Sequence, residues 1–301
     1  MTQISQGEII SVSHLNVFSD ASNYPVLSFF KTSQNGIKQP YIEVRQVVSL
    51  DNLWESTQKK YCLPVSSFRQ FPYSIIPINI EEEEVLLILR LIKDHACIEK
   101  YINFSEGLRI PQGFERKQTS DYHIVKQYQF SKWSEIEKGT YISSNNLKKV
   151  ISKDATRFKI AQVEKILIAE DGLSISATMD ASGSIPQGGL YFGASLSVLN
   201  NWVILAILNS KLLSALYKYL FAGMHMGGGY MRYRSSFLEK LPIPIVNEFF
   251  SQNLSTLARH RINSHEETTN IQLEEKIDKL VYELYCLTEK EIQIIESNVK
   301  I

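Results

Sequence analysis

Cysteine is scarce in this sequence: it occurs only at Cys62, Cys97 and Cys286, without any close pair. An odd number of isolated cysteines argues against a disulfide framework and leaves no ligand pair of the kind that holds zinc. Such cysteine usage is typical of a reducing compartment. We therefore expect a cytoplasmic protein without structural disulfides.

Long apolar runs are absent too. The longest, WVILAIL, ends after seven residues, where Asn209, Ser210 and Lys211 interrupt it, whereas a helix that crosses a bilayer needs about 20. The first ten residues, MTQISQGEII, lack the charged region and apolar core of a signal peptide. We expect neither a membrane span nor a secretory leader.

The sequence also lacks the usual catalytic motifs. It has no F-x-G-x-G loop for S-adenosylmethionine, no Asn-Pro-Pro-aromatic or Asp-Pro-Pro-aromatic tetrapeptide, and no serine in a G-x-S-x-G context. Glu164 and Lys165 are adjacent, which puts them on opposite faces of a strand and does not suit a nuclease of the Asp…Glu-x-Lys class. The six histidines show no metal-ligand spacing. We expect no catalytic residue, metal or cofactor in this chain.

Net charge is zero, with 32 Lys and Arg residues against 32 Asp and Glu, but the charges are unevenly distributed. Residues 109–165 hold 12 basic and 6 acidic residues, whereas residues 246–301 hold 6 basic and 10 acidic. A basic middle and an acidic tail are compatible with a binding site for a polyanion, without proving one.

The chain is long enough for one large core or two smaller ones. Residues 7–48 alternate short β-branched and aromatic runs with polar turns, which predicts a set of antiparallel strands. Asn79 and Glu82 have the spacing of a capping box at the start of an amphipathic helix. From Tyr101 to Gly193 the pattern again indicates strands.

One long buried helix is predicted from Ser197 to Phe221, ended by Gly223 and packed against the central strands. Helices follow to the C-terminus, where Thr288 and Glu291 have the spacing of a second capping box. The predicted fold class is α+β. Its expected parts are a β-rich entry segment with a linking helix (1–97), a central domain (98–245) and C-terminal helices (246–301).

Two stretches have the residue types that contact nucleic acid. In GGGYMRYR, Arg232 and Arg234 would share one face of an extended chain, and Tyr230 could pack on a sugar or base. The loop EGLRIPQGFERK offers arginine and glutamine, which pair with guanine and adenine edges. Each stretch taken alone is also compatible with a solvated loop. The predicted contact residues are Arg109, Gln112, Arg116, Lys117, Lys126, Lys165, Tyr230, Arg232 and Arg234.

The order of several stretches resembles a known family. INFSEGLRIPQGF, EKILIAEDGLSISATMDASG, LYFGASLSVLNNWVILAILNSKLLSALYKYLFAG and GGGYMRYRSSFLEKLPIP are similar to the TaqI-like C-terminal specificity domain. The end, EEKIDKLVYELYCLTEKEIQIIE, resembles the terminal helices of the adenine-specific restriction-modification methylases of the type IIG class. The resemblance extends from about Tyr101 to Ile301, and its most specific part is the block from LNS to LPIP.

This resemblance implies a target recognition domain for residues 98–245, which clamps double-stranded DNA against a separate domain that methylates adenine N6. It also implies that residues 24–100 correspond to the last hairpin of a methylase sheet and a linking helix. The glycine-rich turn would lie where such domains approach the DNA backbone. Because the catalytic motifs are missing, S-adenosylmethionine is expected only in a partner or in a missing catalytic domain.

Three interpretations remain open from the sequence. The chain is a specificity module without chemistry of its own, a split methyltransferase subunit that needs a separately encoded catalytic partner, or a decayed fragment. The strands before Glu81 look cut from a larger sheet, and an unpaired sheet edge invites association. We therefore expect self-association, or binding to a methylase domain, through residues 24–48.

Overall fold

The computed structural model describes residues 3–13, 15, 17, 25–33, 39–51, 55–117, 121–151, 155–195, 197 and 199–298. The chain forms two compact units. The first consists of Met1–Asp94 and Leu216–Gly228, and the second of His95–Ala215 and Gly229–Ile301. The domain boundaries expected from the sequence stay a prediction.

The first unit contains a four-stranded sheet in the order β2-β1-β3-β4. The pairs β1–β2 and β3–β4 are antiparallel, as predicted, but β1 and β3 are parallel. The expectation of a purely antiparallel set is therefore wrong at this pair. Strand β2 lies at the edge of the sheet beside β1, so the chain crosses from there to the opposite side of β1 before β3 begins. The strands are β1 (Gln3–Ser11), β2 (Val26–Ser33), β3 (Tyr41–Val47) and β4 (Thr57–Pro64).

Two helices and a short turn follow the sheet, and the predicted capping box of the longer helix is wrong. The backbone N–H of Glu81 donates to the Glu84 carboxylate instead. Asn79, at φ 60°, accepts from Ser11 Oγ at 2.6 Å and donates to Ser13 Oγ at 2.7 Å, so its side chain ties the loop to the end of β1. The elements are α1 (Val65–Phe68), η1 (Pro72–Ser74) and α2 (Glu82–Asp94).

The second unit is built on two four-stranded sheets that share one core. Ile124 of β8, Leu167 of β10 and Phe192 of β14 are fully buried in it. One sheet has the order β12-β10-β14-β6, with β6 (Ser105–Glu106), β10 (Lys165–Ala169), β12 (Ala177–Asp180) and β14 (Leu190–Gly193). The other has the order β13-β8-β9-β7, with β7 (Glu115–Arg116), β8 (Tyr122–Val125), β9 (Tyr141–Ile142) and β13 (Ile185–Pro186).

Shorter elements complete the central region. Helices α3 (Ser144–Ile151) and α4 (Ala155–Ala161) were not predicted, and Leu147 and Ala161 join them to the shared core. The two-stranded pairs are β11 (Asp171–Gly172) with β15 (Met231–Arg232), and β5 (Ala96–Cys97) with β16 (Pro242–Ile243). The single turns of this unit are η2 (Ile98–Lys100) and η3 (Gln127–Gln129). The turn η4 (Ala222–Met224) belongs to the first unit, and the residues of η5 (Gly227–Gly229) divide between the two units.

The predicted long helix is broken into α5 (Asn201–Leu208) and α6 (Lys211–Leu220), which are bent by 62°. At the break, Asn209 Oδ1 accepts from the backbone N–H of Ala177 and its Nδ2 donates to the Ala177 carbonyl, both at 2.9 Å. Ser214 Oγ accepts from the N–H of Ile175. The side chains at the break therefore supply hydrogen-bond partners to backbone groups of Ile175 and Ala177, at and before the start of strand β12. A continuous helix could not supply these partners.

Helix α5 is as buried as predicted, and it packs on β10, β12 and α8. Of the helices in the described part of the chain, none is by itself long and apolar enough to span a membrane. Only the bent pair of α5 and α6, taken together, has the required length and composition.

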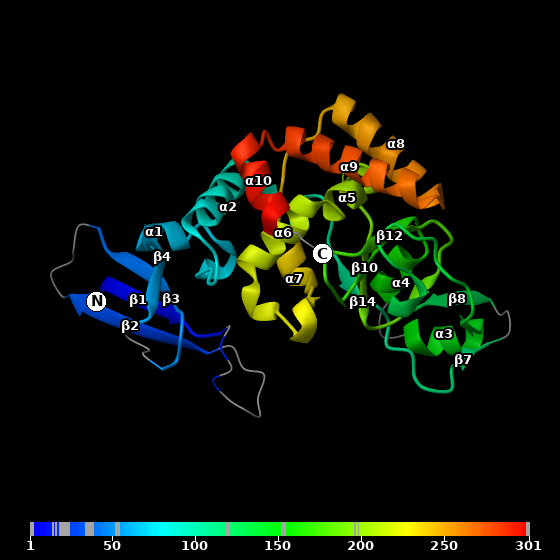
Figure 1. The fold of residues 1–301 in the computed structure, drawn as a ribbon. Coiled ribbons are helices and arrows are strands. Elements are labelled where there is room, and N and C mark those ends of the chain that lie inside the picture. Colours follow the sequence, from blue (N-terminus) through cyan, green and yellow to red (C-terminus); the bar gives the residue numbers. More distant parts are fainter. Residues whose placement is uncertain are drawn as a thin grey trace. The chain divides into compact units, whose positions relative to one another are not determined.

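The chain ends in helices, as predicted. Helices α8 and α9 run side by side (Figure 1). The second capping box is confirmed: Thr288 N–H donates to the Glu291 carboxylate at 2.8 Å, and Glu291 N–H donates to Thr288 Oγ1 at 3.3 Å. The fold class is α+β, as predicted. The helices are α7 (Ser235–Leu238), α8 (Glu248–Asn263), α9 (Glu267–Leu284) and α10 (Glu289–Asn298).

Candidate nucleic-acid interface

Two of the predicted arginines reach the same carboxylate. Arg234 Nη1 lies 3.2 Å from Glu170 Oε1, and Arg232 Nε lies 3.9 Å from the same oxygen. Both arginine side chains are still 43% exposed. Two partly exposed guanidinium groups therefore gather at one point of the surface, and such groups suit an anionic partner.

The glycine-rich turn leads into this cluster. Gly228 and Gly229 have φ values of 71° and 82°, a left-handed conformation that residues with a side chain rarely adopt. The turn delivers Met231 into a backbone pair with Gly172, and Arg232 into a pair with Asp171. The glycines therefore set the path of the chain, and β11 fixes the register of the arginine-bearing strand.

The other predicted loop bends at Gly113 (φ 85°), and it alternates exposed charged or polar residues with buried Leu108 and Ile110. Lys126 Nζ binds the Glu115 carboxylate at 2.6 Å, and Gln187 Nε2 donates to the same carboxylate at 2.9 Å. The hydrogen bond from Lys126 holds the pKa of Glu115 below its usual value. The exposed members of the predicted site here are Arg109, Gln112, Arg116 and Lys117.

A glutamine that the sequence analysis did not select connects the two clusters. Gln127 Oε1 accepts from the backbone N–H of Glu170 at 3.2 Å, and its Nε2 donates to Asp171 Oδ1 at 2.8 Å. The preceding residue, Lys126, binds Glu115. Two consecutive residues thus connect the 109–117 loop with the β11–β15 pair. The structure therefore brings the two predicted clusters together within one unit.

An open cavity of about 650 Å³ lies beside this connection. Tyr128 and Tyr230 line it and are 75% and 46% exposed, while Phe130 and Ala169 are its buried lining residues. Tyr128 was missed because VKQYQF has the pattern of a strand, whereas residues 127–129 form the turn η3. Exposed aromatic side chains beside hydrogen-bonding groups are a common means of contacting bases and sugars.

Lys165 does not belong to a surface that DNA can contact. Its side chain is completely buried, and its Nζ binds the Asp180 carboxylate and the Ala161 carbonyl. Burial lowers its pKa, and Asp180 opposes that effect. The prediction of Lys165 as a contact residue is corrected by this position in the core.

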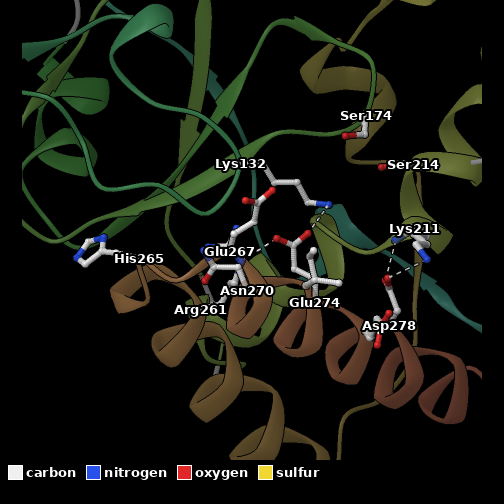
Figure 2. Close-up of a pocket in the computed structure, with 12 residues that line it drawn as sticks. Lys132, Ser174, Lys211, Ser214, Arg261, His265, Glu267, Asn270, Glu274 and Asp278 are labelled. Atoms are coloured by element: carbon white, nitrogen blue, oxygen red, sulfur yellow. Dashed lines mark hydrogen bonds and ion pairs between the residues drawn. The ribbon is translucent and has the colours of Figure 1, made fainter. Parts of the chain in front are cut away.

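A second cavity, of about 380 Å³, is lined by charges that already pair with one another (Figure 2). Glu274 lies between Arg261 at 2.7 Å and Lys132 at 3.6 Å. Asp278 accepts from the N–H of Lys211 at 2.9 Å, and burial raises its pKa to about 6. None of the predicted contact residues lines this cavity, and its ion pairs connect α9 with the central region.

Comparison with known proteins finds a family model that matches the middle of the chain. Residues 116–243 match the TaqI-like C-terminal specificity domain. Among solved structures, the chain is similar to the type IIL restriction-modification enzyme MmeI in complex with DNA, at 13% identity and a TM-score of 0.47, over 98% of this chain and 46% of that one. It is also similar to the type IIG restriction endonuclease BpuSI, at 10% identity and a TM-score of 0.40, over 94% of this chain and 44% of that one.

This chain therefore spans less than half the length of either enzyme. The matched segment of 116–243 contains the β11–β15 pair, the linking residues Lys126 and Gln127, and the broken helix α5–α6. It starts after Arg109 and Gln112 and ends before the C-terminal helices. The resemblance seen in the sequence is confirmed over this segment, which matches the TaqI-like C-terminal specificity domain.

Proposed function

We propose that the chain binds double-stranded DNA in a sequence-specific manner, as the target recognition part of an adenine-N6 methyltransferase or restriction-modification system. The observation that carries the proposal is the match of residues 116–243 to a specificity domain, combined with the clustering of Arg232, Arg234, Lys126 and the 109–117 loop inside the second compact unit. In this proposal, a separate catalytic domain or partner binds S-adenosylmethionine and transfers the methyl group. The isolated cysteines fit a cytoplasmic location.

The contact surface in this proposal has two kinds of residue. Exposed cations hold the phosphates, which supplies affinity without sequence information. Polar and aromatic groups around the 650 Å³ cavity contact the bases. The contact residues are Arg109, Gln112, Arg116, Lys117, Lys126, Tyr230, Arg232 and Arg234, with Gln127 and Tyr128 added by the structure.

A duplex titration at several salt concentrations tests the proposal. Affinity should fall as salt rises, by about 0.9 logarithmic units per logarithmic unit of salt for each phosphate neutralised. Replacing both Arg232 and Arg234 by alanine should lower this slope by up to about two. The matched control replaces the exposed Lys276 and Lys279 of α9, which removes the same charge away from the cluster. A wild-type affinity that does not depend on salt contradicts the proposal.

A second candidate is a split methyltransferase subunit. It is favoured by β2, an outer strand of its sheet, where Phe29 and Phe30 are 45% and 48% exposed. Residues 24 and 34–38 of the expected docking segment lie outside the described residues. The chain alone should transfer no methyl group from S-adenosylmethionine to DNA under the first proposal. Methyl transfer that appears only with a catalytic partner, and is weakened by F29S/F30S, would favour the second.

A further inference from the structure

One carboxylate beside the arginine cluster is not neutralised. Glu170 faces Arg232 and Arg234, whereas Asp171, the next residue, has no ion-pair partner among the described residues. Its Oδ1 accepts a hydrogen bond from the neutral amide of Gln127 at 2.8 Å. A charged carboxylate next to a phosphate-binding surface repels phosphate. Asp171 at this position therefore suits contact with a part of the DNA other than the phosphates.

Asp171 is also held in place. The side-chain amide of Gln127 is fixed by two hydrogen bonds, because its Oε1 accepts from the backbone N–H of Glu170 and its Nε2 donates to Asp171 Oδ1. The backbone of Asp171 pairs with that of Arg232 across β11 and β15. Asp171 therefore lines the 650 Å³ cavity with its carboxylate held by Gln127, and the exposed residues Tyr128 and Tyr230 line the same cavity. Such preorganisation is what selective recognition of one hydrogen-bonding group requires.

We propose that Asp171 is a specificity-determining residue, whose carboxylate accepts a hydrogen bond from the exocyclic amino group of a cytosine in the major groove. This inference rests on the proposed DNA-binding function. An ionised carboxylate only accepts hydrogen bonds. In the major groove cytosine presents the N4 donor, whereas adenine places the acceptor N7 beside its N6 donor, guanine presents two acceptors and thymine one. Cytosine is therefore the base whose major-groove edge offers the carboxylate of Asp171 a donor without placing an acceptor against it. Gln127 acts as the positioning residue of Asp171.

The test is selection of binding sites from a randomised duplex library by the 301-residue chain and its variants. The wild-type chain should prefer cytosine at one position, by about five- to 150-fold. Asp171→Asn should lose that preference or shift it towards adenine, because an asparagine amide pairs with adenine N6 and N7. This variant keeps the shape of the side chain and an oxygen that can accept from Gln127. Gln127→Ala should weaken the preference at the same position.

The matched control is Glu135→Gln, which removes one negative charge from an exposed residue of the same unit and should leave the preference for cytosine unchanged. If Asp171→Asn selects the same bases as the wild-type chain at every position, the inference is overturned while salt-dependent DNA binding still stands. If the changed position prefers adenine in the wild-type chain, the assignment to cytosine is overturned. If the wild-type chain does not bind DNA, both the proposed function and this inference fail.

Discussion

Lys165 and Asp180 form an ion pair in which both side chains are completely shielded from solvent. Lys165 stands at the start of β10 and Asp180 at the end of β12, directly opposite each other in the antiparallel register. Asp180 Oδ1 also accepts from the N–H and the hydroxyl of Ser182. The pair therefore joins two strands and the following turn inside the second compact unit. Its role is structural, although a lysine in a basic segment looks like a DNA contact in the sequence.

Replacing Lys165 by methionine should destabilise the fold strongly. The change leaves the Asp180 carboxylate buried without its cation, which costs about 3–5 kcal/mol. Chemical denaturation should show this as a lower midpoint with little change in slope. The double variant K165M/D180N, which buries no unpaired charge, should recover much of the loss. If K165M is as stable as the wild type and its affinity for DNA depends less on salt, Lys165 contacts DNA and its structural role is contradicted.

Stability should also depend on pH through Asp278. Burial raises the pKa of this carboxyl from 3.8 to about 6 in the folded chain. The folded state therefore binds more protons than the unfolded state between about pH 4 and pH 6, so this group makes stability fall as pH rises through that window. Asp278→Asn should be close to neutral at pH 4 and should stabilise the chain by about 2–3 kcal/mol at pH 7.5.

Thermal or urea unfolding of D278N at the two pH values measures this difference. Glu275→Gln is the matched control, since it removes the same charge from an exposed position of the same helix and should show no such pH-dependent gain. Equal effects of D278N at both pH values would mean that Asp278 stays ionised throughout, with Lys211 compensating its burial.

The break between α5 and α6 should depend on Asn209. Its amide makes two hydrogen bonds with the backbone of Ala177, and the side chain is only 2% exposed. Asn209→Ala leaves the Ala177 N–H buried without its partner, whereas the Ala177 carbonyl still accepts from the N–H of Trp133 at 3.1 Å. A loss of about 1–3 kcal/mol is therefore expected in urea unfolding. Asn253→Ala, an exposed asparagine of α8, should change stability by less than about 0.5 kcal/mol. A similar small effect at Asn209 would contradict the anchoring role of the break.

Features that depend on near neighbours in the chain could be predicted from the amino-acid sequence. The alternation of apolar residues predicted β1, β2 and β3. The continuous apolar run predicted that α5 is buried, and the spacing of Thr288 and Glu291 predicted their mutual cap. The resemblance to a specificity domain was also readable, because it lies in the order of short stretches. The common physical reason is that periodicity and capping involve residues within one or two turns of each other.

Which polar side chains are buried, and which hydrogen-bond partners they have, depends on contacts between distant parts of the folded chain. Asn209 ends a helix because its amide reaches a strand 32 residues earlier, and Asn79 binds β1 instead of capping α2. Lys165 is buried because an acid 15 residues later lies opposite it. Gln127 connects the two clusters through residues 43 and 44 positions away. No local pattern encodes these contacts, because a polar residue can be buried only where the folded chain supplies its hydrogen-bond partner.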